Sequence, residues 1–140
     1  MTLGRQTHTA TRGSRSVLFV DDEPLLGRAV QRELRGHFDC AVSPCLNDAL
    51  TLLQRQGVDF LVADFLLPDG NGVDLLRQVA QRWPRCRRVL VSAHLDHTQF
   101  QSAQAAGLLH ALLRKPWGPD ELLHTLQGLD ARRPRLDSTP

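Results

Sequence analysis

The stretch that decides the fold is VDFLVADFLLPDGNG, residues 58–72. Four consecutive apolar residues, at positions 60–63, are typical of a parallel strand that is covered on both faces. The chain then reaches Asp64 and enters a turn rich in Pro and Gly. We therefore expect Asp64 at the carboxyl end of a central strand, the edge of an open α/β sheet where ligands bind. A single Asp in this position could also merely cap a loop, so the rest of the chain has to decide.

Strand and helix patterns alternate along the remaining chain. Short apolar runs predict four more strands, at residues 17–20, 40–42, 89–91 and 111–113. Apolar residues three and four positions apart predict a helix after each strand, around residues 26–34, 46–53, 73–79, 97–106 and 122–129. Ser43 and Pro44 suggest the N-cap and first residue of the second helix. Five strand–helix pairs predict an α/β fold, a doubly wound five-stranded parallel sheet with helices on both faces.

Composition and charge exclude several classes of protein. A chain of 140 residues fits one domain, and its 41% apolar and 23% charged residues are ordinary globular values. We interpret residues 1–15 as a disordered leader, residues 16–129 as the domain and residues 130–140 as a polar tail. The formal charge of +2 is small, and no basic-aromatic pattern accompanies it. We therefore expect no direct contact with nucleic acid.

The cysteines and the hydropathy pattern bear on the compartment. The three cysteines are odd in number and have no CxxC spacing, which argues against a disulfide framework and for a reducing compartment. No stretch approaches the roughly 18 apolar residues of a membrane-spanning helix, and the polar start of the chain lacks the apolar core of a signal peptide. We therefore expect a cytoplasmic protein without a membrane anchor.

Polar side chains follow the predicted strands at the point where four of the five strands end. They are Asp21, Asp22, Asp64, Ser92 and Lys115. Carboxylates within 4 to 6 Å of each other repel by about 4 kcal/mol per close pair, so they need a counter-charge. Oxygen ligands alone favour a hard cation, and Mg²⁺ fits best because it keeps several waters. A cation, an ammonium and a hydroxyl around one carboxylate can stabilise a transferring phosphoryl group, with the carboxylate as nucleophile.

Each of these residues also has an ordinary structural explanation. Acidic residues often begin helices, Ser often ends a strand, and a Lys-Pro pair often lies in a solvated loop. Taken one at a time, these explanations are the more common ones. Their coincidence at one edge of a small domain favours a functional site.

Residues 16–129 resemble the response-regulator receiver domain of two-component signalling. The matching features are Asp21-Asp22 after the first strand, Asp64 after the third, the spacing of Asp64, Pro68 and Gly72, Ser92-Ala93 after the fourth strand and Lys115-Pro116 after the fifth. The resemblance implies a flavodoxin-like fold. It also implies that Asp64 is the phosphoacceptor, and that Asp22, Asp64 and the backbone carbonyl of Leu66 bind Mg²⁺ directly while Asp21 acts largely through water.

The resemblance also assigns Ser92 and Lys115 to contacts with the phosphoryl group, and three positions depart from the family pattern. Two residues beyond the phosphoacceptor stands apolar Leu66, which offers no hydrogen bond to a water. Two residues beyond Ser92 stands His94, either a proton-handling group or a solvated loop residue. Leu112 replaces the usual aromatic residue of the fifth strand, so we expect activation to move the loop after Ser92 more than the fifth strand.

The implied function is a phosphorylation-controlled signalling module and not a turnover enzyme. Its partners would be a sensor histidine kinase or phosphotransfer protein and either a downstream protein or a fused output domain, with a homodimer also possible. Three alternatives stay open: a receiver fragment of a larger regulator, a receiver used only for docking, and a small phosphatase of the haloacid-dehalogenase type. The phosphatase family carries Asp-x-Asp after its first strand, whereas this chain has adjacent Asp21-Asp22.

Overall fold

The computed structural model describes residues 15–93 and 97–132. Five parallel strands form one sheet in the order β3-β2-β4-β7-β8. They are β2 (Arg15–Val20), β3 (Phe38–Ser43), β4 (Phe60–Asp64), β7 (Arg87–Ser92) and β8 (Ala111–Arg114). The predicted doubly wound parallel sheet is confirmed, with β4 at its centre as its continuous apolar run indicates.

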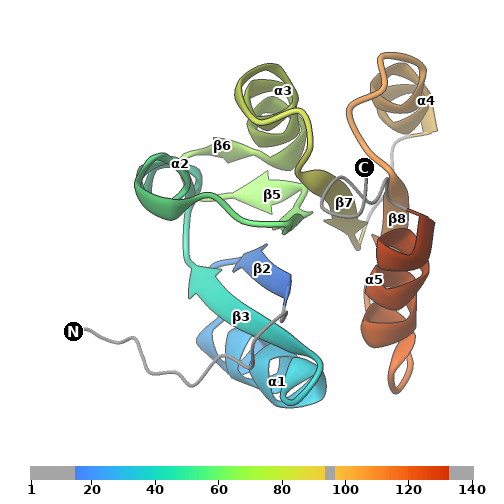
Figure 1. Ribbon diagram of the computed structural model, residues 1–140. Helices are drawn as coiled ribbons and strands as arrows, with labels where there is room; N and C mark the ends of the chain where they lie inside the picture. Colours follow the sequence, from blue (N-terminus) through green and yellow to red (C-terminus); the bar gives the residue numbers. More distant parts are fainter. Residues whose placement is uncertain (1–14, 94–96, 133–140) are drawn as a thin grey trace, which may run out of the picture.

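Helices cover both faces of the sheet (Figure 1). They are α1 (Pro24–Leu34), α2 (Leu46–Gln56), α3 (Gly72–Arg82), α4 (His97–Ala105) and α5 (Glu121–Arg132). The apolar sides of α1 and α5 pack on one face, and those of α2, α3 and α4 pack on the other. Among the described residues, no helix is both long and apolar enough to cross a lipid bilayer.

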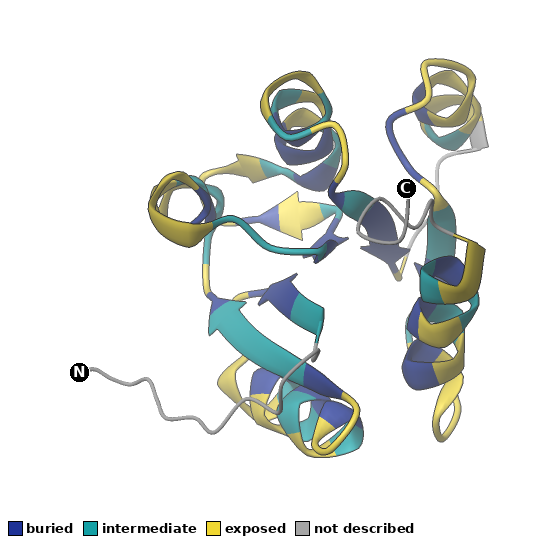
Figure 2. Ribbon diagram, in the orientation of Figure 1, coloured by how far each residue is buried: buried dark blue, intermediate teal, exposed yellow. Residues whose placement is uncertain are grey.

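Alternation along the strands divides the core between the two faces. On β2, Leu18 and Val20 join the cluster beneath α2, α3 and α4, whereas Val17 and Phe19 join the cluster beneath α1 and α5. All four side chains are buried, as are the helix sides that face the sheet (Figure 2). Each fully buried aliphatic or aromatic side chain contributes about 1.5–3 kcal/mol. The sheet is therefore a rigid platform for the loops at its carboxyl end.

The strand order brings the predicted site residues together. From β2 the chain moves outward to β3 and then returns past β2 to β4, so the order reverses between β2 and β4. Asp21 follows β2, and Asp64 ends β4 beside it. A reversal of this kind leaves a crevice at the carboxyl ends of the strands, where ligands bind in open α/β sheets.

The prediction for the start of α2 was wrong. Ser43 is the last residue of β3, pairs with Val20, and its carbonyl accepts a hydrogen bond from the backbone N–H of Asp21 at 3.0 Å. The N-cap is Cys45, whose thiol accepts from Asp48 at 3.5 Å. The carboxylate of Asp69 accepts the first two N–H groups of the helix, from Leu46 at 2.8 Å and Asn47 at 2.9 Å. A residue distant in sequence thus caps the helix, and Ser43 stays in the sheet.

A buried arginine organises the amino-terminal ends of β7 and β8. Arg88 is 5% exposed, and its guanidinium donates to the carbonyls of Cys86 at 2.7 Å and Leu108 at 2.8 Å, with longer bonds to Pro84 and Gly107. These carbonyls belong to the segments that precede β7 and β8. Because carbonyls satisfy this cation, the arginine fixes both segments without a buried carboxylate.

Candidate functional site

The ammonium of Lys115 is the centre of the predicted site. It lies 2.7 Å from Asp21 Oδ2, 3.2 Å from Asp64 Oδ2 and 3.5 Å from Glu23 Oε1. Asp21 is 2% exposed and Asp64 is also buried. Three carboxylates from two loops therefore share one cation, which offsets their mutual repulsion.

Burial and charge shift the pKa values of two of these groups. Burial raises the pKa of the Asp64 carboxyl above its ordinary value, Lys115 opposes the shift, and Asp21 adds to it. Burial alone would lower the pKa of Lys115, but its hydrogen bond to Asp21 and the two negative charges outweigh that effect and raise it. Lys115 therefore keeps its proton, and an added positive charge near Asp64 would favour the ionised form of its carboxyl.

The loop after β2 presents its acidic residues in different ways. The carboxylate of Asp21 accepts the N–H of Glu23 at 2.9 Å through one oxygen and the ammonium of Lys115 through the other. Asp22 is exposed, and Pro24 then opens α1. Asp21 is thus oriented by the protein, whereas Asp22 is exposed to solvent.

The loop after β4 is a short hairpin that holds Asp64 at the edge of the sheet. It consists of β5 (Leu66–Leu67) and β6 (Gly70–Asn71). The N–H of Phe65 donates to Val91 at 2.8 Å, and the N–H of Gly72 donates to Phe65 at 2.8 Å. A Cβ at Gly72 would collide with the carbonyl oxygen of Asp64, so this position requires glycine. Leu66 is 64% exposed, and its N–H supports the Asp64 carboxylate.

Ser92 and the remaining family positions have different surroundings. Ser92 is buried at the end of β7, and its carbonyl accepts the N–H of Lys115 at 3.0 Å, which aligns the two strand ends. The following peptide bond, between Lys115 and Pro116, is cis. Leu112 is partly buried against the core on the side of α2, α3 and α4. His94 lies outside the described residues.

The donor chemistry of the site fits a hard divalent cation. Residues 15–93 and 97–132 contain no group of three or more His, Cys, Asp or Glu side chains arranged to hold a metal ion. The ammonium of Lys115 lies between the carboxylates of Asp21 and Asp64. The set expected from the sequence needs only two carboxylates and one carbonyl, all oxygen donors of the kind Mg²⁺ takes.

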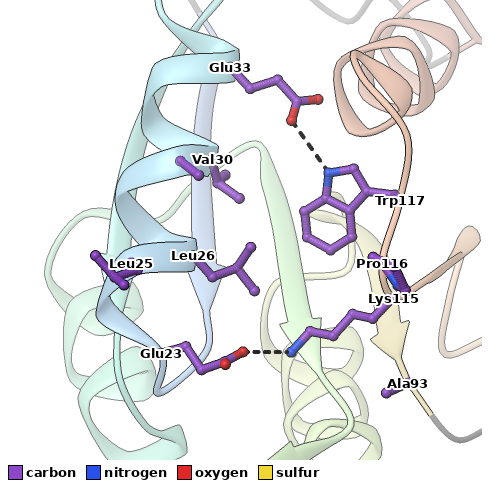
Figure 3. A pocket seen from close by; sticks show the side chains of 10 residues that line it. Glu23, Leu25, Leu26, Val30, Glu33, Ala93, Lys115, Pro116 and Trp117 are labelled. Carbon is purple, nitrogen blue, oxygen red and sulfur yellow. Dashed lines mark hydrogen bonds and ion pairs between the residues drawn. The ribbon is translucent and has the colours of Figure 1, made fainter.

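A groove that the sequence did not predict lies beside Lys115. A cavity of about 630 Å³ lies between α1 and the segment after β8, with walls that include Leu25, Leu26, Val30, Pro116 and Trp117 (Figure 3). Glu23 lies at one end of the groove and Glu33 at the other, where its carboxylate accepts from the indole N–H of Trp117. In the sequence, the acidic run Asp21-Asp22-Glu23 could have indicated a role for Glu23 at this groove. Glu33 carries no comparable signal, because it looks like an ordinary residue on a helix surface.

Known proteins resemble this chain in sequence. The family model described as "Response regulator receiver domain" matches residues 17–127. The hydrogenase transcriptional regulatory protein HoxA of Cupriavidus necator is 32% identical over 87% of this chain and 27% of its own length. The alginate biosynthesis transcriptional regulatory protein AlgB of Pseudomonas syringae is 34% identical over 89% of this chain and 28% of its own length. The chain thus spans about a quarter of the length of these relatives.

Solved structures agree with the family match. The signal receiver domain of an HD domain-containing protein from Pseudomonas fluorescens has a TM-score of 0.80 and 26% identity, and the match covers 86% of this chain and 97% of that one. The BeF3-activated DrrB receiver domain has a TM-score of 0.77 and 21% identity, and the match covers 85% of this chain and 99% of that one, which shows the fold alone. The chain belongs to the response regulator receiver domain family, whose members signal by accepting a phosphoryl group.

Proposed function

We propose that Asp64 accepts a phosphoryl group from a phosphohistidine on a sensor kinase or phosphotransfer protein. The observation that carries the proposal is the ammonium of Lys115 within 3.2 Å of a buried carboxylate at the end of the central strand. In the reaction, a carboxylate oxygen of Asp64 attacks phosphorus, the P–N bond of the donor breaks, and the leaving imidazole takes a proton. The product is an acyl phosphate on Asp64.

The neighbouring side chains stabilise the added charge. The ammonium of Lys115 is already beside the carboxylate, so it can pair with a phosphoryl oxygen after a small movement. Ser92 on the adjacent strand end supplies a hydroxyl. Charge-assisted bonds of this kind contribute about 1.5–3 kcal/mol each.

Mg²⁺ is the cofactor that these donors suit. Asp22, Asp64 and the backbone carbonyl of Leu66 would hold the ion directly, with Asp21 acting through water. Bound there, Mg²⁺ would neutralise charge on the phosphoryl oxygens. The raised pKa of Asp64, which burial causes first and Asp21 increases, supports a site that benefits from a second positive charge.

The groove beside Lys115 supports an interaction with the protein that donates the phosphoryl group. Leu25 at its rim is 75% exposed, and the groove opens next to the ammonium. An exposed apolar side chain beside a charged site is typical of a contact surface. Leu25→Arg should slow transfer from a partner protein at least about tenfold, equivalent to 1.4 kcal/mol, but leave labelling by acetyl phosphate unchanged.

The downstream role follows from the relatives by analogy. HoxA and AlgB are transcriptional regulatory proteins about four times the length of the matched region. We infer that this receiver controls either a fused output domain or a separate partner protein and performs no turnover of its own beyond its phosphorylation and dephosphorylation. None of the three cysteines forms a disulfide, which supports the cytoplasm as its compartment.

Intact mass spectrometry tests the proposal. With acetyl phosphate and Mg²⁺ the chain should gain the mass of one phosphoryl group, and Asp64→Asn should gain none. An unchanged mass gain in that variant would sink the assignment of Asp64. Rapid turnover of a generic phosphate ester would instead favour the haloacid-dehalogenase type of phosphatase.

A further inference from the structure

We propose that Glu33 is a positioning residue for Lys115 and acts through Trp117. The inference rests on the proposed function, because it assumes that Lys115 contacts the phosphoryl group. It assigns a role in the phosphorylation site to a residue three turns along α1 from the acidic loop. Figure 3 shows the two pairs, Glu33 with Trp117 and Glu23 with Lys115, at opposite ends of the groove.

The carboxylate of Glu33 joins α1 to two parts of the segment that follows β8. One oxygen accepts from the indole Nε1 of Trp117 at 3.4 Å, and the other accepts from the backbone N–H of Leu123 at 3.0 Å. Leu123 lies in the first turn of α5, where backbone N–H groups lack helical partners and favour negative charge. A single side chain thus holds both the indole and the start of α5.

Trp117 connects this carboxylate to the phosphorylation site. Its ring meets Phe19 of β2 edge to face, with 6.3 Å between the ring centroids. Phe19 is fully buried and lies two residues before Asp21. Trp117 itself lies two residues after Lys115, so the indole anchors the backbone from which the lysine extends. The indole N–H is therefore bonded to Glu33, and the ring packs against Phe19 of β2.

The competing contacts of Lys115 explain why its anchorage matters. Its ammonium reaches Asp21 and Asp64, but also the exposed Glu23 at 3.5 Å. Loosening the backbone around Trp117 would let the flexible lysine spend more time with Glu23 and less with Asp64. Phosphoryl binding would then weaken, whereas the expected Mg²⁺ ligands lie on other loops and would keep their positions.

Glu121 provides a matched control. Its carboxylate accepts the backbone N–H of Gly118 at 2.9 Å, so it also stabilises the start of α5. Among the described residues, the indole N–H of Trp117 donates to Glu33 and not to Glu121. Glu33→Ala and Glu121→Ala both remove a carboxylate that supports α5, but only the first removes the partner of the indole.

The experiment measures binding of the phosphoryl mimic BeF₃⁻ at saturating Mg²⁺, with the full chain carrying Trp83→Phe so that Trp117 is the remaining indole. We expect Glu33→Ala to weaken BeF₃⁻ binding by about three- to tenfold, equivalent to about 0.7–1.4 kcal/mol. Mg²⁺ affinity should not fall, and the emission of Trp117 should shift. Glu33→Gln, which keeps an acceptor oxygen, should recover part of the loss.

A coupling measurement completes the test. Trp117→Phe keeps an aromatic ring but removes the indole N–H, so Glu33→Ala combined with it should bind BeF₃⁻ no more weakly than the weaker single variant. The inference is overturned if Glu33→Ala binds BeF₃⁻ as tightly as Glu121→Ala, or if the two losses add. If the parent chain binds no BeF₃⁻ at all, the proposed function itself fails.

Discussion

Two cations at opposite ends of the sheet, the partly buried Lys115 and the buried Arg88, have different kinds of partner. At the carboxyl end, Lys115 is held by carboxylates, with Asp21 at 2.7 Å and Asp64 at 3.2 Å. At the amino end, Arg88 is held by backbone carbonyls, with Cys86 at 2.7 Å and Leu108 at 2.8 Å. Carbonyls carry no charge that can be titrated or neutralised, whereas each carboxylate can bind another cation or a phosphoryl group.

The different partners of the two cations indicate that Lys115 can change its partners, whereas Arg88 has a structural role. Lys115 has a flexible stem and three donors, so it can exchange a carboxylate for a phosphoryl oxygen without leaving the site. The planar guanidinium of Arg88 is matched to four fixed oxygens, and moving it would leave those oxygens unsatisfied. We therefore expect Lys115 to control activity and Arg88 to control stability.

The first prediction concerns the largest expected effects, which follow from removing each of the two cations. Arg88→Met should lower the free energy of unfolding by about 3 kcal/mol or more, because several buried carbonyls lose their donor. Lys115→Met should slow phosphorylation by roughly 100- to 1000-fold, the usual effect of losing one electrostatic contact to the reacting group. Urea unfolding and labelling by acetyl phosphate measure the two effects. A large loss of stability in the lysine variant with normal labelling would reverse the assignment.

The second prediction concerns the Mg²⁺ ligands at the carboxyl end of the sheet. Asp22→Ala should weaken Mg²⁺ binding by roughly 100-fold, as expected for a direct ligand, and Asp21→Ala by about tenfold, the lower range for a residue that acts through a water. Titration of tryptophan emission or amide signals with Mg²⁺ gives both affinities. Equal losses in the two variants would mean that the ligand roles are misassigned.

The third prediction concerns titration at the two ends. His110 Nδ1 accepts the backbone N–H of Arg88 at 2.9 Å, and burial, followed by the charges of Arg88 and Arg87, lowers the pKa of His110 to about 4. Between pH 4 and the ordinary value of 6.5, the unfolded chain then binds a proton that the folded chain does not. Stability should therefore rise with pH across this window.

Asp64 titrates with the opposite sign. Its folded pKa is raised, by burial first, so the stability of the metal-free chain should fall as pH rises through that pKa. Comparing the unfolding profiles of the parent chain, His110→Asn and Asp64→Asn separates the two contributions. An NMR titration of His110 with a midpoint near 6.5 would contradict the account of the amino end.

The fourth prediction concerns the smallest effect, the movement that follows activation. With Leu112 in place of an aromatic residue, BeF₃⁻ and Mg²⁺ should change amide shifts mainly between Ser92 and Phe100, with small changes at residues 111–113. The carbonyl bonds of Arg88 should keep the end of α4 nearly still. Dominant changes at residues 111–113 outside the active site would mean that Leu112 acts as the switch.

The grouping of the candidate site residues was predictable from the sequence because its parts are local. The central strands contain short apolar runs, and the candidate site residues stand where such runs end, as Asp64 does at the end of β4 and Lys115 does directly after β8. Parallel strands bring their carboxyl ends to one edge, so the grouping of these residues follows from the strand assignment alone.

Other contacts depend on packing between distant segments, and the sequence carries no signal for them. Glu33 and Trp117 are 84 positions apart and meet only because α1 and α5 cover the same face. Arg88 looks like a surface residue at the start of a strand, yet its side chain is buried. The start of α2 was misassigned for a similar reason, because Asp69 supplies the cap from the hairpin after β4.

A crystal structure with Mg²⁺ and BeF₃⁻ bound would test the central claim most directly, because it would show the partners of Lys115 and of Arg88 in the same molecule. We predict that Lys115 Nζ leaves its 2.7 Å contact with Asp21 and lies about 3 Å from a fluoride on Asp64, while the four carbonyl bonds of Arg88 are unchanged. A structure in which Lys115 still joins Asp21 to Asp64, with BeF₃⁻ bound to Asp64 and out of reach of the ammonium, would contradict the account.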